Sequence, residues 1–387
     1  MTSSREMCSP SCSLKRFIFP LPEDTEDGTK RRPTIVDVAR KAGVSLGTAS
    51  KAANNQEGVS PKSRAKVAEA IRELNYSPLF AARQLKSGLS RTVSLHLVIP
   101  SDGVIHPSTW TFFLPIIQGF VSRAKEEGYR PQLELTSAAE LSDFASLQSF
   151  VVGHQLTGSA FIVLQSGDYS SIAKLAHMGR RVVTLYSKAH EAVPSICTNN
   201  THESQRVVQW LRRIGHQRVA FVDGLAWHTS SIERRAGYEA GVAGTGYKHI
   251  FRGDWTTQSG VAALDHFVSL AEPPSAIFCA NDDMAVGVIE ASRRLGVRIP
   301  EDLSLVGFDD NYLCQLAQPK LSSVRMPLFK MGDEAALLMI RGTTCDGRGT
   351  AEHRVFPSRI VVRRSAISHP YEKTGKARAA RGAMRHE

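Results

Sequence analysis

Two short amphipathic segments separated by a glycine open the patterned part of the chain, in "TIVDVARKAGVSLGTASKAANN" (residues 34–55). Thr34 and the aspartate three residues later provide an N-terminal cap, and Gly43 ends the first predicted helix. Ser45 caps a second helix, with Ala49 and Ala52 on its inner side. In the first helix, apolar side chains recur at helical spacing, at Ile35, Val38, Ala39 and Ala42.

A third helix follows in "GVSPKSRAKVAEAIRELNY". Ser60 is its cap, and Pro61 occupies the first helical position, where a missing N–H costs nothing. The small residues Ala39, Gly43 and Ala49 allow the first two helices to pack closely at a steep angle. The pattern predicts a helix-turn-helix whose second helix presents the residues after Ser45 to the major groove of DNA, although short helix pairs also occur as structural corners. The inward stripe of the third helix is Val67, Ala70, Ile71 and Leu74.

From about Thr92 the pattern changes to β-rich apolar runs separated by helical patterns. Strands that alternate with helices indicate parallel sheets covered on both faces. The region exceeds the usual size of one domain, so we expect two lobes. The predicted strands are "TVSLHLVIP", "PQLELTS", "SAFIVLQS", "RRVVTLYS", "RVAFVDG", "SAIFCAND" and "LSLVGFDD"; the clearest predicted helices are "FFLPIIQGFVSRAKEEGY", "ESQRVVQWLRRIGH" and "DMAVGVIEASRRLG".

The charge of the chain is concentrated at its ends. The 387 residues have a net charge of +11, of which residues 1–90 carry +6 and residues 363–387 carry +5. The 272 residues between them are neutral overall. This distribution indicates that the ends meet a polyanion while the middle does not. For the C-terminal segment, a solubilising tail is an equally good interpretation.

The remaining composition excludes several classes of protein. The six cysteines form no CxxC pair and no histidine cluster has metal-ligand spacing, so we expect reduced thiols, no metal and no cofactor. No apolar run reaches the roughly 18–20 residues of a membrane span, and we expect no membrane association. Residues 1–32 lack the apolar core of a signal peptide and are predicted to be a disordered extension, or the result of a misplaced start codon.

The head resembles the DNA-binding domain of the lactose-repressor (LacI/GalR) family. The matching residues are "TIVDVARKAGVSLGTASKAANN" and "VSPKSRAKVAEAIRELNYSPLFAARQLKSG", about 55 in all. The resemblance implies an α/β protein with an all-α helix-turn-helix head and a two-lobed, periplasmic-binding-protein-like body with parallel sheets. The predicted domains are the extension 1–32, the head 33–77, a hinge helix and linker 78–90, the body 91–366 and a basic tail 367–387.

The resemblance also assigns DNA contacts. Leu46, Gly47 and Lys51 occupy the base-reading positions, where Leu46 suits a thymine methyl and Lys51 can donate to guanine. The family often has arginine in place of Lys51, so we expect softer base discrimination there. Predicted phosphate contacts are Ser45, Thr48, Ser50 and Asn54; the alternative is that Thr48 and Asn54 only cap or solvate the helix. Thr34 is also predicted to be a DNA-binding residue.

The segment "SPLFAARQLKSG" resembles the hinge helix of the family. Eight or nine residues are too few for a stable isolated helix, so its order must come from DNA or from a partner. On this resemblance Leu85 enters the minor groove, Ala82 packs beside it, and Arg83 and Lys86 lie near phosphate. A flexible linker is the alternative interpretation.

The body resembles the family's sensor in "GHQRVAFVDG", "ERRAGY", "SAIFCANDDMAVGVIEASRRLGVRIPEDLSLVGFDD" and "VVRRS". A hydroxylated ligand requires polar groups and a flat apolar surface at strand ends between lobes. Arg234 offers a planar set of N–H donors, and Asn281 offers both a donor and an acceptor. Asp309 offers two acceptor oxygens, and Trp255 offers a ring face for stacking. On the resemblance, these four residues occupy positions that contact the effector in the family. Tyr186 and Ser187 follow a strand and are expected to line the cleft. Asp282 and Asp310 are interpreted as helix caps or as contacts between the two lobes.

Three functions were compared. The leading hypothesis is a transcription regulator, most simply a repressor, located in the cytoplasm at the nucleoid. It binds palindromic double-stranded operator DNA as a homodimer and is switched by a small effector such as a carbohydrate. A solute-binding protein of a transporter would need export, and the head argues against it. For an enzyme, the sequence shows no Walker loop, GxGxxG, GxSxG or catalytic triad, so no catalytic residue is predicted.

Overall fold

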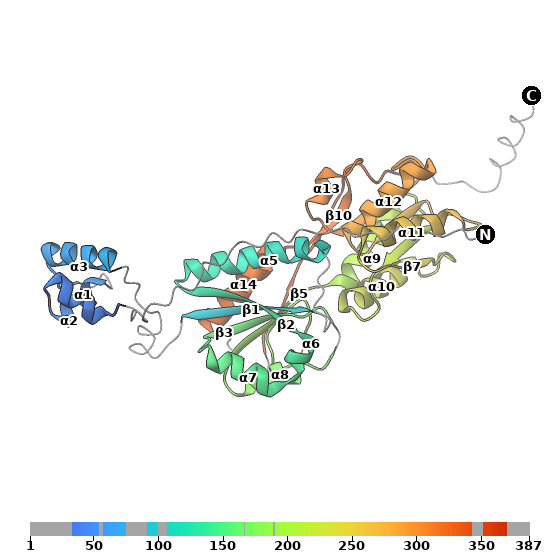
Figure 1. Cartoon of the computed structure of the whole chain (residues 1–387). Coiled ribbons are helices and arrows are strands. Elements are labelled where there is room, and N and C mark those ends of the chain that lie inside the picture. The colour runs from blue at the N-terminus through green and yellow to red at the C-terminus, as the bar shows by residue number, and fades with distance from the viewer. Residues whose placement is uncertain are drawn as a thin grey trace, which may run out of the picture. The chain divides into compact units, whose positions relative to one another are not determined.

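The computed structural model describes seven stretches of the chain: residues 33–53, 57–74, 91–99, 107–165, 167–188, 190–342 and 351–369. The chain divides into two compact units, residues 1–87 and 88–387, which are treated separately below (Figure 1). The predicted extension 1–32, the hinge at 78–90 and residues 370–387 of the predicted tail lie outside the described residues.

The first unit contains the predicted helix-turn-helix, formed by α1 (Ile35–Ala42), α2 (Leu46–Ala53) and α3 (Pro61–Glu73). Gly43 follows α1 with φ 63°, a left-handed conformation that glycine adopts without strain. The carboxylate of Asp37 accepts hydrogen bonds from the backbone N–H and the hydroxyl of Thr34 at 2.8 and 2.7 Å. The predicted inward residues form the buried core of this unit: Val38, Ala39, Ala42, Ala49, Val67 and Ala70.

The second unit begins with a lobe built on a six-stranded parallel sheet in the order β11-β5-β4-β3-β1-β2. Alternate residues of a strand enter separate cores on its two faces, as Ala160 and Phe161 of β3 show. The strands are β1 (Thr92–Ile99), β2 (Arg130–Ser137), β3 (Gly158–Ile162), β4 (Arg181–Leu185), β5 (Ser195–Thr198) and β11 (His353–Phe356); the helices are α5 (Pro107–Glu126), α6 (Ala138–Ser142), α7 (Phe144–Gly153), α8 (Ser170–His177) and α14 (Leu328–Arg341).

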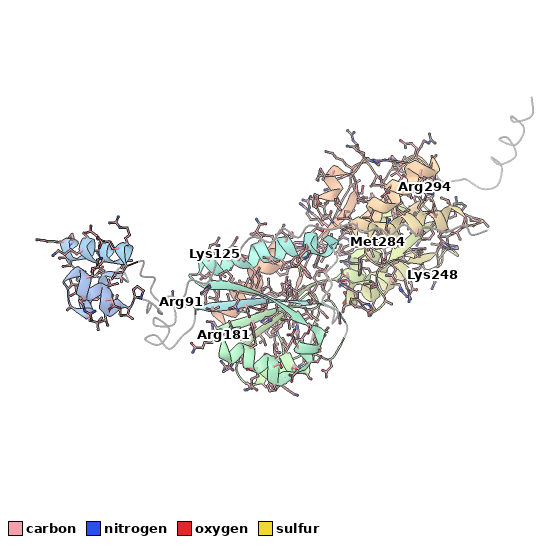
Figure 2. All side chains as sticks on the ribbon, in the orientation of Figure 1. Arg91, Lys125, Arg181, Lys248, Met284 and Arg294 are labelled. Carbon is pink, nitrogen blue, oxygen red and sulfur yellow. The ribbon has the colours of Figure 1, made fainter. Side chains whose placement is uncertain are left out.

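The second lobe has a sheet in the order β12-β10-β9-β8-β6-β7, parallel except that β12 pairs antiparallel with β10. Side chains fill the space between each sheet and its helices, while charged residues such as Lys248 lie outside (Figure 2). The strands are β6 (Val219–Asp223), β7 (Ile250–Arg252), β8 (Ala276–Cys279), β9 (Ser304–Asp309), β10 (Ser322–Arg325) and β12 (Arg359–Val361); the helices are α9 (Asn200–Arg213), α10 (Thr229–Val242), α11 (Thr257–Val268), α12 (Asp282–Leu295) and α13 (Leu313–Leu316).

The chain crosses between the two lobes three times, after β5, after β10 and after β11. All seven predicted strands are present, and the two-lobed parallel architecture is confirmed. Strands β5, β7, β10, β11 and β12 were not predicted, because each has only three or four residues and polar or charged residues interrupt its apolar run; β8 is equally short but wholly apolar. Hydrogen bonds of the second lobe continue to His369, three residues beyond the predicted end of the body at 366.

Glycines set the distance between the paired helices α5 and α14. A Cβ added at Gly119 of α5 would lie 1.9 Å from the Phe329 carbonyl oxygen, and one added at Gly332 of α14 would lie 2.0 Å from the Ile116 carbonyl oxygen. Each helix therefore presents a glycine to the backbone of the other. No larger residue fits at either position unless the helices move apart.

We predict that Gly332→Ala lowers the free energy of unfolding by about 1–3 kcal/mol or more, because the added methyl overpacks a helix contact. Gly153→Ala is the matched control, since a Cβ at this helical glycine meets nothing within 4 Å. It should change stability by less than about 1 kcal/mol, toward greater stability. Urea denaturation of both variants measures the difference, and equal effects would contradict the close helix contact.

Candidate functional site

The body contains a cavity of about 420 Å³ lined by residues of both lobes and of the second crossover. Leu164 follows β3, Tyr186 follows β4, Asn281 follows β8 and Asp309 ends β9. The carboxyl ends of parallel strands therefore surround the cavity, which is where ligands bind in open α/β sheets. The cavity falls within the ~300–1,000 Å³ range of small-molecule sites.

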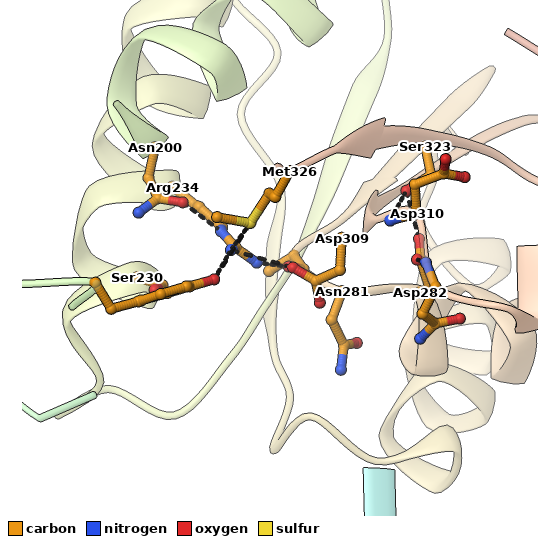
Figure 3. A network of polar contacts seen from close by, with 12 residues as sticks. Asn200, Ser230, Arg234, Asn281, Asp282, Asp309, Asp310, Ser323 and Met326 are labelled. Carbon is orange, nitrogen blue, oxygen red and sulfur yellow. Dashed lines mark hydrogen bonds and ion pairs between the residues drawn. The ribbon is translucent and has the colours of Figure 1, made fainter. Parts of the chain in front are cut away.

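Arg234 of α10 is the most connected residue of the cavity (Figure 3). Its Nε donates to Asn200 Oδ1 at 3.0 Å, and its Nη2 donates to the Tyr186 hydroxyl at 3.1 Å and to Asp309 Oδ1 at 3.3 Å. Its Nη1 donates to the Ala280 carbonyl oxygen. Its side chain is only 2 % exposed, so Arg234 is not a plain surface charge.

Asn200 holds this arginine in place and was missed by the sequence analysis. Its Nδ2 donates to Glu233 Oε2 at 2.7 Å, which leaves Oδ1 directed to Arg234 Nε. The guanidinium also lies over the Phe308 ring, 3.7 Å from its centroid. A buried cation needs partners of this kind to offset its lost hydration. The only sequence signal was the polar pair that ends the apolar run "SICTNN".

Asp309 faces Arg234 from the end of β9. Burial raises its pKa to about 7, although the neighbouring guanidinium of Arg234 opposes the shift. Of the five described non-glycine residues with positive φ, four line the cavity: Tyr186, Trp255, Asp309 and Asp310. Backbone strain of this kind tends to gather at functional sites.

Asn281 and Trp255 also line the cavity, as predicted. Asn281 Oδ1 accepts from the Met284 N–H and Nδ2 donates to the Trp255 carbonyl, both at 2.9 Å, so this side chain caps α12 and holds the Trp255 segment. The Trp255 ring lies edge-to-face with the His228 ring at 5.0 Å. His228 also lines the cavity and was not predicted.

Of the other residues named from the sequence, Asp310 lines the cavity, whereas Ser187 and Asp282 are not among its described lining residues. Asp282 accepts from the Asn311 N–H and the Ser323 hydroxyl, and Asp310 pairs with Arg325 and Arg363. The partners of both aspartates lie in the second lobe, so these contacts are structural but do not join the two lobes.

The predicted base-reading residues lie on the outer surface of α2. Leu46 is 50 % exposed, Lys51 is exposed, and a Cβ at Gly47 would meet nothing closer than 4.0 Å. The Ser45 hydroxyl oxygen accepts from the Thr48 N–H at 3.1 Å and shares a hydrogen bond with the Thr48 hydroxyl at 2.8 Å. This supports the capping alternative for Thr48 and gives Ser45 a capping role too.

Of the other predicted DNA contacts, the structure describes Ser50 and Thr34. Ser50 is half-buried, and Thr34 is the N-cap residue that precedes α1. The rest lie outside the described residues: Asn54, Ala82, Arg83, Leu85 and Lys86.

Within the described ranges, no helix has the length and apolarity that crossing a membrane requires. In the same part of the chain, no three His, Cys, Asp or Glu side chains come together as a potential metal site.

A helix-turn-helix unit joined to a two-lobed body with a cavity at the strand ends is the architecture of a DNA-binding transcriptional regulator. Residues 34–78 match the model of bacterial regulatory proteins of the lacI family, and residues 208–366 match that of a periplasmic binding protein-like domain. The chain is 30% identical to the probable HTH-type transcriptional repressor ExuR of Bacillus subtilis (strain 168), over 86% of this chain and 98% of the relative. The chain belongs to the lacI family and is a transcriptional regulator, not an enzyme.

Two solved structures resemble this chain. A complex of the transcriptional regulator CelR with cellobiose has a TM-score of 0.59 and 27% identity, covering 86% of this chain and 100% of its own. A lac repressor dimer bound to operator and the anti-inducer ONPF has a TM-score of 0.70 and covers 87% and 99%; at 24% identity it shows the shared fold.

The raised pKa of Asp309 predicts a pH dependence of stability. The folded protein binds this proton more tightly than the unfolded chain does, so the stability present below the ordinary pKa of 3.8 is lost as pH rises through about 7. Asp309→Asn cannot titrate, so its free energy of unfolding should fall less than that of the wild type between pH 4 and pH 8. Urea denaturation at several pH values measures both, and parallel curves would contradict the raised pKa.

Proposed function

We propose that the protein is an effector-controlled repressor that binds palindromic operator DNA as a homodimer, in the bacterial cytoplasm at the nucleoid. The effector is a small polar molecule such as a sugar or sugar derivative. The observation that carries this proposal is the cavity itself, where Arg234 and Asp309 are already paired at the strand ends. A site organised before binding spends less free energy on ordering its side chains.

The described contacts support a hydroxylated effector. Arg234 uses one Asp309 oxygen, which leaves the other carboxylate oxygen to accept a ligand hydroxyl. Trp255 lines the same cavity with an indole ring that suits the C–H face of a sugar. The related CelR structure contains cellobiose, a sugar of this kind.

The exposed face of α2 supports the proposed DNA contacts. Leu46 can contact a thymine methyl, and Lys51 can donate to guanine O6 or N7. Gly47 allows close approach but reads no base. Contacts of the hinge residues, with Leu85 in the minor groove, remain part of the same proposal and lie outside the described residues.

Unpartnered apolar residues support a homodimer. Strand β2 is the outer edge of its sheet, and Leu133 and Leu135 on it are 46 % and 54 % exposed. Trp110 and Leu114 on α5 are also exposed, and α5 packs against β2. An exposed apolar edge strand invites pairing with another chain unless it is covered. The lac repressor structure with the same fold is a dimer.

Asp309→Ala should abolish the response to effector and leave operator affinity near normal, because Asp309 belongs to the cavity and not to the head. Operator DNA is first selected from random duplexes, and calorimetry against sugars and nucleosides identifies a ligand. Asp302→Ala is the control, since Asp302 pairs with Arg298 on the surface. Unchanged ligand affinity in Asp309→Ala would remove Asp309 from the site.

Lys51→Ala should cost about 1–3 kcal/mol of discrimination at one base pair in each half-site, because it removes one base contact. Non-specific binding should be largely kept. Lys174→Ala, an exposed lysine of the body, removes the same charge and should leave the preference intact. Gel shifts with operators substituted at single positions measure this, and an unchanged base preference in Lys51→Ala would exclude Lys51 from base reading.

A further inference from the structure

The cavity has two chemically unlike walls. One wall comes from the second lobe and is polar, with Arg234, His228, Asn281, Asp283 and Asp309. The other comes from α5, from the segment after β3 and from the second crossover with the start of α14. This second set, called here the apolar wall, consists of Phe112, Pro115, Leu164, Met326, Leu328 and Phe329.

The apolar wall is partly open. Phe329 is 46 % exposed, and Phe112, Pro115 and Leu164 are half-buried, whereas the other two residues of this wall are buried. Covering the open part is favourable because it removes apolar surface from water. A ligand made only of hydroxyl groups gains nothing there, because hydroxyls placed against apolar carbon lose their water without a new partner.

The polar wall offers few open hydrogen-bonding groups. Four of the five N–H bonds of Arg234 are directed to protein atoms, and both polar atoms of Asn281 have partners. His228 Nδ1 accepts from the Ser230 N–H at 3.2 Å, so the neutral ring carries its proton on Nε2. Burial lowers the pKa of His228 to about 3, which keeps the ring neutral. The wall therefore holds a hydroxylated group with a small number of bonds.

Tyr186 joins the two walls. Its ring meets the Phe112 ring edge-to-face at 4.8 Å, while its hydroxyl accepts from Arg234 Nη2 at 3.1 Å. Polar and apolar surfaces are thus adjacent within one residue. A single molecule with a hydroxylated part and an apolar part attached to it matches this arrangement.

We infer that the effector is such a two-part molecule: a hydroxylated ring on the polar wall, bonded to a planar apolar ring that covers the apolar wall. This inference rests on the proposed function and narrows its ligand class. An aromatic glycoside and a nucleoside share this chemistry. The planar ring supplies most of the affinity, because the polar wall is largely occupied by its own hydrogen bonds.

Calorimetry of the full chain with matched pairs tests the inference. The pairs are D-glucose, D-galactose and D-xylose with their phenyl β-glycosides, and D-ribose with cytidine and adenosine. At least one conjugate should bind tenfold or more tightly than its free sugar, and the arm in which it appears distinguishes an aromatic aglycone from a nucleobase. The inference is overturned if free sugars bind as tightly as their conjugates, or if no conjugate binds.

A variant of the apolar wall tests whether the planar ring of the conjugate binds there. Phe329→Ser should reduce the affinity of the conjugate at least fivefold and leave that of the free sugar unchanged. Met178→Ser is the control, since Met178 is 50 % exposed and lies outside the cavity lining. Thermal denaturation checks that both variants fold, and an unchanged ratio of the two affinities in Phe329→Ser places the planar ring elsewhere.

The two proposals fail in different ways. A free sugar that binds as tightly as its conjugate and changes operator affinity leaves the proposed function standing and overturns the two-part ligand. If no probe binds and operator affinity responds to none of them, both proposals fail.

Discussion

The buried guanidinium of Arg234 is the interaction on which the body depends. A cation that is 2 % exposed has lost its water and must be paired, or the fold would lose several kcal/mol. Its partners come from Tyr186 in the first lobe, from Asn200 at the first crossover, and from Ala280 and Asp309 in the second lobe. The requirement to satisfy one charge therefore fixes the lobes against each other at the cavity.

Under the proposed function, this arrangement links ligand binding to the contact between the lobes. A ligand that binds the second oxygen of Asp309 engages the same carboxylate that Arg234 holds, and Arg234 also holds Tyr186 of the other lobe. The free energy of ligand binding can then change the contacts that hold the two lobes together. Couplings between sites are typically about 1–3 kcal/mol, which is enough to alter operator occupancy.

The sequence predicted what depends on local pattern. Gly43 and Ser45 marked the turn of the head, and strand-ending residues such as Asp309 marked the cavity. It missed contacts that exist only once distant segments meet, such as that of Asn200 with Arg234. It also missed the whole apolar wall, because the sequence alone does not distinguish an apolar residue of α5 that lines a cavity from one in the core. It also placed Ser187 in the cleft, although only its neighbour Tyr186 reaches the cavity. Five strands of three or four residues were not found because each includes polar or charged residues, whereas β8, equally short, is wholly apolar.

Hydrogen exchange at the contact between lobes tests the central role of Arg234 most directly. The Thr229 N–H donates to the Leu164 carbonyl at 3.0 Å, a backbone bond between the two lobes. Arg234→Lys keeps the charge but lacks the planar fork, so exchange at Thr229 should become at least tenfold faster. Arg235→Lys, whose arginine pairs with Asp223 within one lobe, should leave it unchanged. Wild-type exchange at Thr229 in Arg234→Lys would contradict the account.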